Sequence, residues 1–538
     1  MSTKAAFASI LDSATAAGAW GLYPASNFHI TTVSCTDGAT LRQASWYFRA
    51  ETIAVPATGM PVSTWAPGVL AFDDIRQWAV TRPADATIDY PPLVWIAAPD
   101  VARRARMSAD GRELNTPGGA LPFRPVARIP LNRSYYDASS VAWLGERTLS
   151  VRGTFTAEGF IARTFWPDAW ALGPRTPTAR SLPTAGSAAE ALRILMREEP
   201  RGGAQRPYHA AMLWQRKAGD PTLVGRTILG FMVNGAQGDD DEAHGGHFAL
   251  VTGRVQPDGA IGDWLVNNFY ALDVESEKGI IAAPLPLDNY LADLNSGQGW
   301  YRPSYMLVAL LRDDRAAGLV QAALNRVYHQ FYRHQLEYYH PSDNCASISV
   351  DTLRALGWNV PARGPTSRTL AWFAFPFIAL KERSLDKAQV AFDYLVTDQT
   401  RLMPAAALEE VFGSLWAMSR GETATAAGSL ATMLAEDLEG LAWLRFPQFP
   451  SSRSFGNAPA VSTWEYEKLI PKDPALRQIV PVPPRPLPAA LRDPDLLRRA
   501  WRPSDTALLG WSLITVVGLP YAVWRVWKWW RSRRGGPA

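Results

Sequence analysis

Cysteine is almost absent from this chain: only Cys35 and Cys345 occur in 538 residues. So few cysteines exclude a disulfide-stapled fold, because at most one bridge is available. The fold must therefore rest on the hydrophobic residues, which make up 47% of the sequence and support sizeable cores. For Cys345, the two interpretations are a nucleophile and a small apolar residue in a core.

Charge is also scarce, since charged residues make up 19% of the chain and the formal net charge is +4. A broad basic surface that would follow a phosphate backbone is therefore not expected, and nucleic acid is excluded as a predicted partner. Near the N-terminus, the apolar run "AAFASIL" is followed directly by Asp12. That run does not predict a cleaved export signal.

One long uncharged run occurs near the C-terminus, "TALLGWSLITVVGLPYAVW" over residues 506–524. About 20 apolar residues cross a bilayer core, so we predict a transmembrane helix with a basic aromatic tail over 504–530. The lipid bilayer is then a partner of a single-pass membrane protein. Arginines flank the run on both sides and leave the orientation open. The alternative is a buried or surface-lying amphipathic helix.

Four regions follow from the distribution of residue types. Residues 1–175 alternate aromatic and β-branched residues between Pro and Gly, which predicts a β-rich N-terminal domain. Residues 188–445 combine strand-like and helical patterns and form the second predicted domain, largely helical beyond Cys345. Residues 446–503 are rich in proline and predict a stalk before the membrane segment. The expected fold class is α+β.

Cys345 lies within "HPSDNCASISVDTLRALGW", residues 340–358. Pro341 to Asn344 stop one helix and offer capping side chains, and "CASISVDTLRAL" then predicts a helix that ends before Gly357. The first turn of a helix has unpaired N–H groups that favour a thiolate and an oxyanion. Asp343 acts against this if its carboxylate faces the sulfur. A buried structural cysteine is the alternative.

A base for such a thiol is suggested by "DDDEAHGGHFALVTG", residues 239–253. His247 opens a predicted strand after two glycines, and His244 is a weaker candidate within the acidic loop. A hairpin turning at residues 257–260 brings residues near 268–270 opposite His247. Asn268, or else Asn267, is then expected to orient the imidazole. His340 is a fallback base.

Metal binding is not predicted, although His244, His247 and the acidic run 239–242 are close in sequence. The spacing "HGGH" differs from the helical "HExxH", and no further Cys or His cluster completes a ligand set. We therefore expect neither a metal nor another cofactor.

The order of these motifs resembles the circularly permuted NlpC-type papain-like fold, in which the histidine precedes the cysteine. More narrowly, "GGHFALVTG" and "YYHPSDNCASISVDTLRALGW" are similar to the Gly-His strand and Asn-Cys helix of the Lnb N-terminal periplasmic domain family. The resemblance covers about residues 205–360. It implies a permuted papain-like domain in a bacterial cell-envelope protein. It also implies Cys345 as nucleophile, His247 as general base, and Asn268 or Asn267 as the orienting residue.

Two functions follow from these observations. The first is a membrane-anchored cysteine hydrolase or acyltransferase that cleaves an amide or ester bond in a cell-envelope peptide or lipid. The alternative is a non-catalytic, membrane-anchored binding or scaffold protein that contains a papain-like domain. An activated thiol at Cys345 distinguishes the two.

Overall fold

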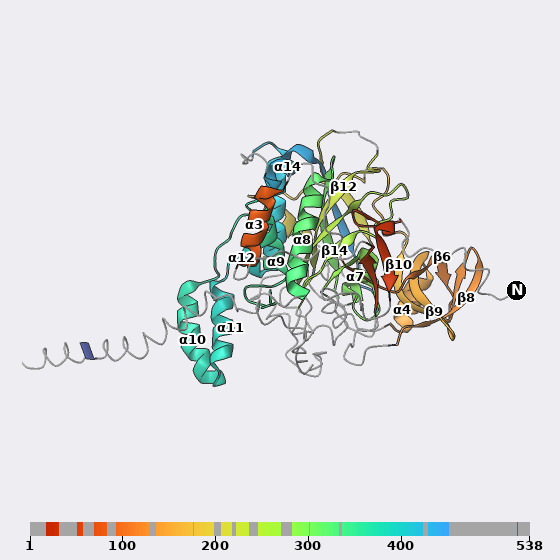
Figure 1. Ribbon diagram of the computed structural model, residues 1–538, viewed down its shortest axis with the longest axis horizontal. Coiled ribbons are helices and arrows are strands. Elements are labelled where there is room, and N and C mark those ends of the chain that lie inside the picture. The colour runs from red at the N-terminus through yellow and green to blue at the C-terminus, as the bar shows by residue number, and fades with distance from the viewer. Residues whose placement is uncertain are drawn as a thin grey trace, which may run out of the picture. The chain divides into compact units, whose positions relative to one another are not determined.

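The computed structural model describes most of the chain, and its helices and strands form two compact units (Figure 1). One unit lies within Met1–Arg363 and Gln399–Leu497, and the other within Gly364–Asp398 and Arg498–Ala538. The described residues are 18–31, 51–57, 69–82, 93–127, 136–175, 177–197, 206–217, 222–235, 246–270, 282–300, 302–332, 336–422, 429–450 and 524–525.

An antiparallel sheet forms the centre of the first unit, with seven strands in the order β11-β17-β16-β12-β13-β14-β15. Every residue of β12 and of β16 is buried, which requires cover on both faces of the sheet. Both strands therefore have nearly continuous apolar sequences instead of an alternating pattern. The strands are β11 His209–Gln215, β12 Thr227–Asn234, β13 His247–Arg254, β14 Leu265–Asn267, β15 Pro284–Pro286, β16 Ser304–Leu311 and β17 Leu438–Phe446.

Helices from the C-terminal half of the unit pack on this sheet. Three of them contact β13: α8 Arg315–Tyr332, α9 Cys345–Ala355 and α13 Pro404–Ser419. Helix α3, Ala71–Thr81, comes from the N-terminal part of the chain and packs on α8 and α9 (Figure 1). The remaining helices in the described part of this unit are α4 Ala138–Gly145, α5 Ala188–Arg197, α7 Leu287–Ala292, α12 Gln399–Leu402 and α14 Leu430–Asp437, with short 3-10 turns at Ala25–Asn27 and Gln298–Trp300.

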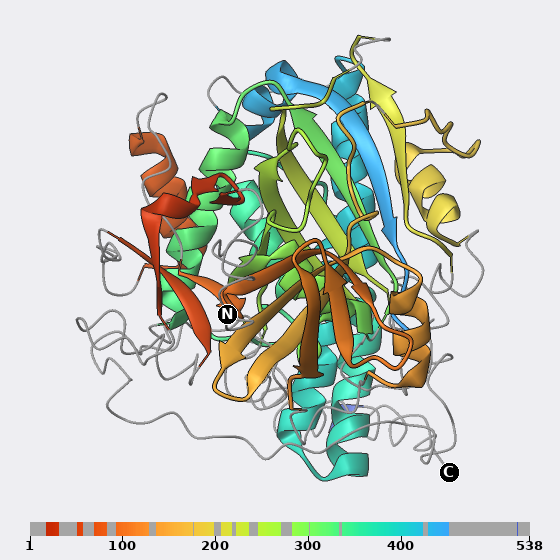
Figure 2. The ribbon, with the colours of Figure 1, turned by 90° about the vertical axis from the view of Figure 1, so that its right-hand side faces the viewer.

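A small closed barrel of five strands precedes the sheet in sequence and is coloured orange in Figure 2. Closure leaves no free edge between its strands. Gly153 permits the close pairing of β9 with β10, because a Cβ at that position would collide with the Phe160 ring and the Ile161 carbonyl. The barrel strands are β6 Asp100–Met107, β7 Glu113–Thr116, β8 Gly119–Pro125, β9 Leu149–Thr156 and β10 Gly159–Pro167. Shorter strands before them are β1 Ala19–Trp20, β2 Tyr23–Pro24, β3 Phe28–Thr31, β4 Thr52–Pro56 and β5 Val94–Ala97.

Buried ion pairs join the barrel to the segments around the sheet. The Arg152 guanidinium, on β9, donates to the carboxylates of Asp263 and Asp288. All three of these side chains are at most 8% exposed. Arg163, on β10, donates to Asp293 at 2.7 Å and to Glu51 at 2.7 Å. Since each arginine is desolvated, both depend on their carboxylate partners for charge compensation.

Two segments near the predicted domain boundaries adopt a local structure that their sequence pattern does not indicate. Residues 438–446 were expected within a largely helical region, but they form β17, which pairs with both β11 and β16. The predicted stalk from residue 446 also begins inside the core, where Phe446 and Phe449 are 1% exposed and Phe449 stacks on Trp300 at 4.6 Å. Both segments are apolar, and they pack on residues that are far away in the sequence. The rest of the predicted stalk lies outside the described residues.

The predicted fold class must also be corrected with respect to the membrane. Within the described ranges, the fold is a mixed α+β one in which no helix is both long and apolar enough to cross a bilayer. The apolar helices α10, Arg368–Glu382, and α13 have 15 and 16 residues, whereas about 20 residues are needed. The predicted span, 504–530, lies outside the described residues except for Trp524 and Arg525.

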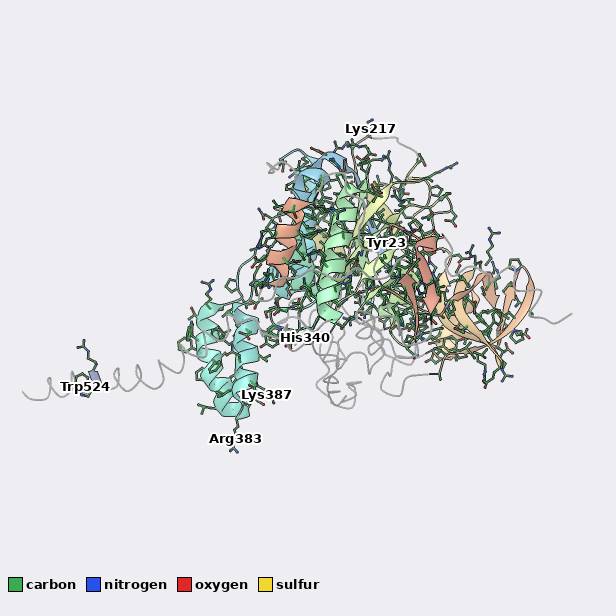
Figure 3. The ribbon with its side chains drawn as sticks, viewed as in Figure 1. Tyr23, Lys217, His340, Arg383, Lys387 and Trp524 are labelled. Carbon is green, nitrogen blue, oxygen red and sulfur yellow. The ribbon has the colours of Figure 1, made fainter. Side chains whose placement is uncertain are left out.

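The second unit contains a helical hairpin of α10, Arg368–Glu382, and α11, Leu385–Val396. Its two helices share an apolar cluster that includes Phe375 and Phe392. The opposite side of α10 stays exposed, with Phe373 at 71% and Leu380 at 80%. Figure 3 labels Arg383 and Lys387 at one end of this hairpin. Helix α10 is therefore packed on one side and exposed on the other.

The buried ion pairs generate the first prediction. Replacing Arg152 by leucine leaves the carboxylates of Asp263 and Asp288 buried without their cation, so we expect the free energy of unfolding to fall by about 3–5 kcal/mol. The matched control is Arg124→Leu, because Arg124 also lies in the barrel but its side chain is 59% exposed beside Glu158. That change is expected to cost less than about 1 kcal/mol. Urea unfolding of both variants measures the difference, and equal costs would contradict it.

Candidate active site

His247 is the first residue of β13 and is 2% exposed. Gly246 precedes it with φ +92°, a backbone conformation that residues other than glycine rarely adopt. Across the sheet, His247 is paired in register with Asn234 of β12, and Asn234 with Ser304 of β16. The imidazole is therefore fixed at the end of a wholly buried strand, at one edge of a row of polar residues.

A hydrogen bond between His247 and Asn268 orients the imidazole. The distance from His247 Nε2 to Asn268 Oδ1 is 2.8 Å, and Asn268 is 2% exposed. Because an amide oxygen only accepts, this contact places the ring proton on Nε2. The other ring nitrogen, Nδ1, then carries the lone pair that a general base requires.

Strand register explains why Asn268 and not Asn267 makes this contact. In the last pair of the two strands, Leu250 lies opposite Asn267. Extending the same register by three residues places Tyr270 opposite His247. The rings of these last two residues stack, with centroids 4.4 Å apart and an angle of 13°. The Asn267 side chain instead exchanges hydrogen bonds of 2.9 and 3.1 Å with Gln321 of α8. Asn267 therefore holds β14 against a helix and does not reach the imidazole.

Cys345 is the first residue of α9, as the sequence predicted, and is 5% exposed. Asn344 caps the helix through Oδ1, which accepts from the N–H groups of Ala346 at 2.9 Å and Ser347 at 3.0 Å. Two of the first-turn donors expected to be unpaired are thus occupied by the cap. The Cys345 N–H faces the Tyr338 hydroxyl at a longer distance of 3.4 Å.

The Cys345 sulfur lies beside the strand that carries His247. Burial raises the pKa of the Cys345 thiol, while hydrogen bonds from the Phe248 backbone N–H and the Tyr338 hydroxyl act in the opposite direction. Phe248 directly follows His247 in β13. For His247, burial lowers the pKa to about 3, and the positive charge of Arg302 acts in the same direction. The resting site is therefore a neutral thiol beside a neutral imidazole.

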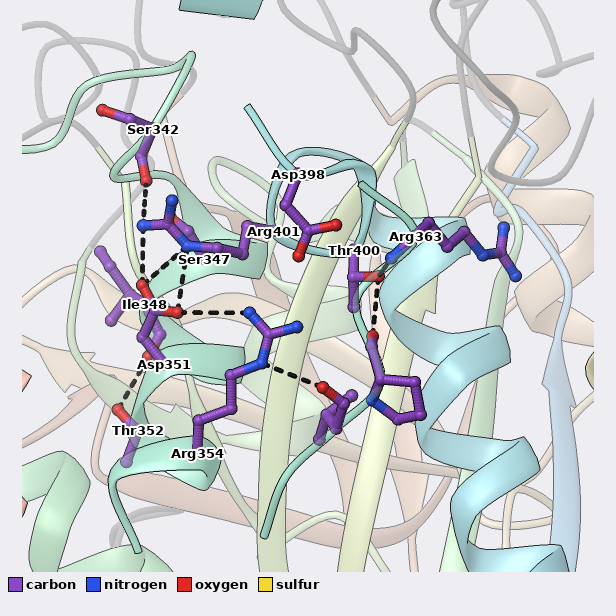
Figure 4. A network of polar contacts seen from close by, with 12 residues as sticks. Ser342, Ser347, Ile348, Asp351, Thr352, Arg354, Arg363, Asp398, Thr400 and Arg401 are labelled. Carbon is purple, nitrogen blue, oxygen red and sulfur yellow. Dashed lines mark hydrogen bonds and ion pairs between the residues drawn. The ribbon is translucent and has the colours of Figure 1, made fainter. Parts of the chain in front are cut away.

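An ion-pair network fastens the helix that carries Cys345 (Figure 4). The Arg401 guanidinium, on α12, donates to Asp351 of α9 at 2.7 and 2.9 Å and to the Ser342 carbonyl at 3.1 Å. One arginine thus holds both α9 and the turn that leads into Cys345. Asp343, predicted to oppose a thiolate, instead accepts from the Ser342 hydroxyl at 2.7 Å.

Further polar side chains surround the pair, and sequence reasoning missed all of them. The Tyr290 hydroxyl donates to Asn234 Oδ1, and Asn234 Nδ2 donates to Ser304 Oγ at 2.7 Å. Arg302, two residues before Ser304, acts electrostatically on His247, Cys345 and Tyr290. Only Tyr338 had a sequence signal, because it belongs to the "YYHPSDNC" motif. The others reach the site through strand pairing that no local pattern displays.

The remaining candidates lie elsewhere or outside the described residues. His340 is exposed, and its ring meets the Tyr338 ring edge-on at 5.1 Å. His244 and Cys35 fall outside the described residues. Among the side chains that are described, no group of three or more His, Cys, Asp or Glu residues is placed to hold a metal ion.

We compared the chain with protein-family models, with curated proteins and with solved structures, and none of them matches it. The interpretation of the site therefore rests on the geometry of its own residues.

The lowered pKa of His247 predicts how stability changes with pH. The unfolded chain binds a proton at this histidine near pH 6.5, whereas the folded chain does so only near pH 3. Its contribution to stability is therefore fully present above pH 6.5 and is lost as the pH falls toward 3. Between pH 6 and 4, we expect the free energy of unfolding to fall more steeply in the wild type than in His247→Gln, by up to about 1.4 kcal/mol per pH unit.

Urea unfolding at a series of pH values measures this slope. The variant His340→Gln is the control, because it removes an exposed imidazole from the same region and is expected to keep the wild-type slope. Identical slopes for the wild type and His247→Gln would contradict a buried neutral imidazole.

Proposed function

We propose that this protein is a cysteine hydrolase or acyltransferase that cleaves an amide or ester bond. Cys345 is the nucleophile, His247 the general base and Asn268 the residue that orients the base. The observation that carries the proposal is the 2.8 Å bond from His247 Nε2 to Asn268, made where the Cys345 sulfur meets the backbone N–H of Phe248. The base is thus bonded to its orienting group, and the residue that follows the base in β13 contacts the nucleophile.

The reaction starts from the neutral pair. His247 Nδ1 takes the proton from the Cys345 thiol as the sulfur forms a bond to the substrate carbonyl carbon, whose oxygen becomes negatively charged. When the carbon–nitrogen or carbon–oxygen bond of the substrate breaks, the imidazolium returns that proton to the leaving group. Water or another acceptor then attacks the thioester, His247 removes its proton, and the free thiol is regenerated.

Two donors beside the sulfur suit the oxyanion. The Cys345 N–H and the Tyr338 hydroxyl lie 3.4 Å apart and both belong to the immediate surroundings of the sulfur. The contact between them is long, so a substrate oxygen that accepts from both groups displaces only a weak hydrogen bond. Two preorganised donors of this kind are the usual device for stabilising a tetrahedral intermediate.

The order of the site residues supports the resemblance to permuted papain-like enzymes, because the strand that carries the base precedes the helix that carries the nucleophile. On that basis, we propose that the substrate is a peptide amide or a lipid acyl ester. The choice between hydrolysis and acyl transfer depends on which acceptor attacks the thioester.

The proposal is tested with p-nitrophenyl acetate as an acyl donor and intact-protein mass spectrometry as the readout. We expect one acetyl group on Cys345 and a matching burst of p-nitrophenol, with no adduct in Cys345→Ala. His247→Ala is expected to slow acylation by about 10²–10⁴-fold, the usual contribution of a general base.

Asn268 and Asn267 provide a matched pair of controls. Asn268→Ala removes the acceptor that fixes the imidazole tautomer, so its acylation rate is expected between those of the wild type and His247→Ala. Asn267→Ala removes an amide that bonds to Gln321 and is expected to acylate at the wild-type rate. If acylation does not depend on His247, or if the acetyl group is found on another residue, the result contradicts catalysis by Cys345 and favours a binding or scaffold role.

A further inference from the structure

Arg302 is a buried cation without a hydrogen-bond partner for two of its nitrogens. Arg302 is only 6% exposed. In the part of the chain that the structure describes, no acceptor lies within hydrogen-bond distance of its Nε or Nη1. Arg326 of α8, which is also 6% exposed, instead donates to Asp74 at 2.8 Å. A guanidinium stays charged in a protein, so burial without a counter-ion costs several kcal/mol. Such an exception requires an explanation.

The guanidinium faces the candidate active site. Arg302 is two residues before Ser304, which is paired across the sheet with Asn234, and Asn234 is paired in turn with His247. Its positive charge lowers the pKa of His247 and acts on Cys345 in the direction of the thiolate. The charge therefore lies close enough to act on both His247 and Cys345.

Gln298 adds an unsatisfied acceptor to the same place. Its backbone carbonyl accepts from the Arg302 N–H at 3.1 Å, and its Nε2 donates to the Tyr270 hydroxyl at 3.0 Å. The Tyr270 ring stacks on His247. Gln298 is 1% exposed, and among the described residues its Oε1 has no donor. An unused cation and an unused acceptor thus line one side of the site.

We propose that Arg302 binds a carboxylate of the substrate, and that Gln298 Oε1 accepts from an N–H or O–H of the same molecule. This inference rests on the proposed function and narrows its substrates to acyl compounds that carry a carboxylate near the bond that is cleaved. One guanidinium balances one carboxylate, whereas a phosphate dianion would leave net negative charge in a buried site. No described residue accepts a hydrogen bond from Nε or Nη1 of Arg302, so a bound carboxylate would compensate the buried charge and favour anionic over neutral substrates.

The test compares iodoacetate with iodoacetamide, which differ in a carboxylate and a neutral amide. Both reagents alkylate Cys345 in the full chain, with Cys35→Ser to leave a single thiol. We expect the ratio of the iodoacetate rate to the iodoacetamide rate to exceed that of free cysteine by about 10-fold or more. A 10-fold preference corresponds to about 1.4 kcal/mol, the low end for hydrogen bonds to charged groups.

Three variants test whether Arg302 causes the preference for iodoacetate over iodoacetamide. Arg302→Gln is expected to bring the ratio back to the value for free cysteine. Arg302→Lys keeps the charge but loses the planar fork, and is expected to keep part of the preference. Arg420→Gln is the control, since Arg420 is half-exposed beside Glu422 and its loss changes the net charge equally. In the wild type, acetate but not acetamide is expected to protect Cys345 from iodoacetamide.

The outcomes separate this inference from the proposed function. A wild-type ratio equal to that of free cysteine overturns the carboxylate site, while an iodoacetamide rate that depends on His247 still supports the Cys–His pair. If Arg302→Gln slows both reagents equally, Arg302 serves the thiolate and not a substrate carboxylate. A Cys345 that reacts with neither reagent in the folded chain overturns both. If Arg302→Gln does not fold, protection by acetate and the Arg302→Lys ratio decide.

Discussion

The packing of helix α9 on strand β13 is the constraint on which the candidate site depends. It brings the first residue of the helix, Cys345, beside the strand that begins at His247, although 97 residues separate the two in sequence. The cap at Asn344 fixes where the helix begins, and the salt bridge from Arg401 to Asp351 holds the helix in place. A shift of one residue in β13 would turn the His247 side chain to the other face of the sheet, and a shift of one residue in α9 would rotate Cys345 to another side of the helix.

Burial determines the electrostatics of this site. It raises the pKa of the Cys345 thiol and lowers the pKa of the His247 imidazole, so both groups are uncharged at neutral pH. Burial also makes the Arg302 charge energetically unfavourable, because no described residue accepts a hydrogen bond from its Nε or Nη1. The same guanidinium further lowers the pKa of His247 and so disfavours an imidazolium. An anionic substrate would offset that charge and so favour proton transfer to His247 at the moment of binding.

Elsewhere in the first unit, buried charges are compensated internally. Arg152 and Arg163 of the barrel each have two carboxylate partners from other segments, including residues near β14 and in and after α7. These contacts tie the barrel to α7 and to the segment before β14, and the ring of Tyr290 in α7 lies 6.3 Å from the His247 ring. The barrel is thus part of the framework that positions the polar residues of the site, whatever else it binds.

The sequence by itself determined the local features: the helix from Cys345, with its cap at Asn344 and its end before Gly357, and the strand from His247 after Gly246. These depend on residues within a few positions of one another, such as capping side chains and glycines. Only the tertiary structure shows that Asn268, and not Asn267, bonds to His247, and that residues 438–446 form a strand. It also places Arg302 and Gln298 near His247. Strand register and long-range pairing depend on partners far away in the chain, and no local pattern of residues carries that information.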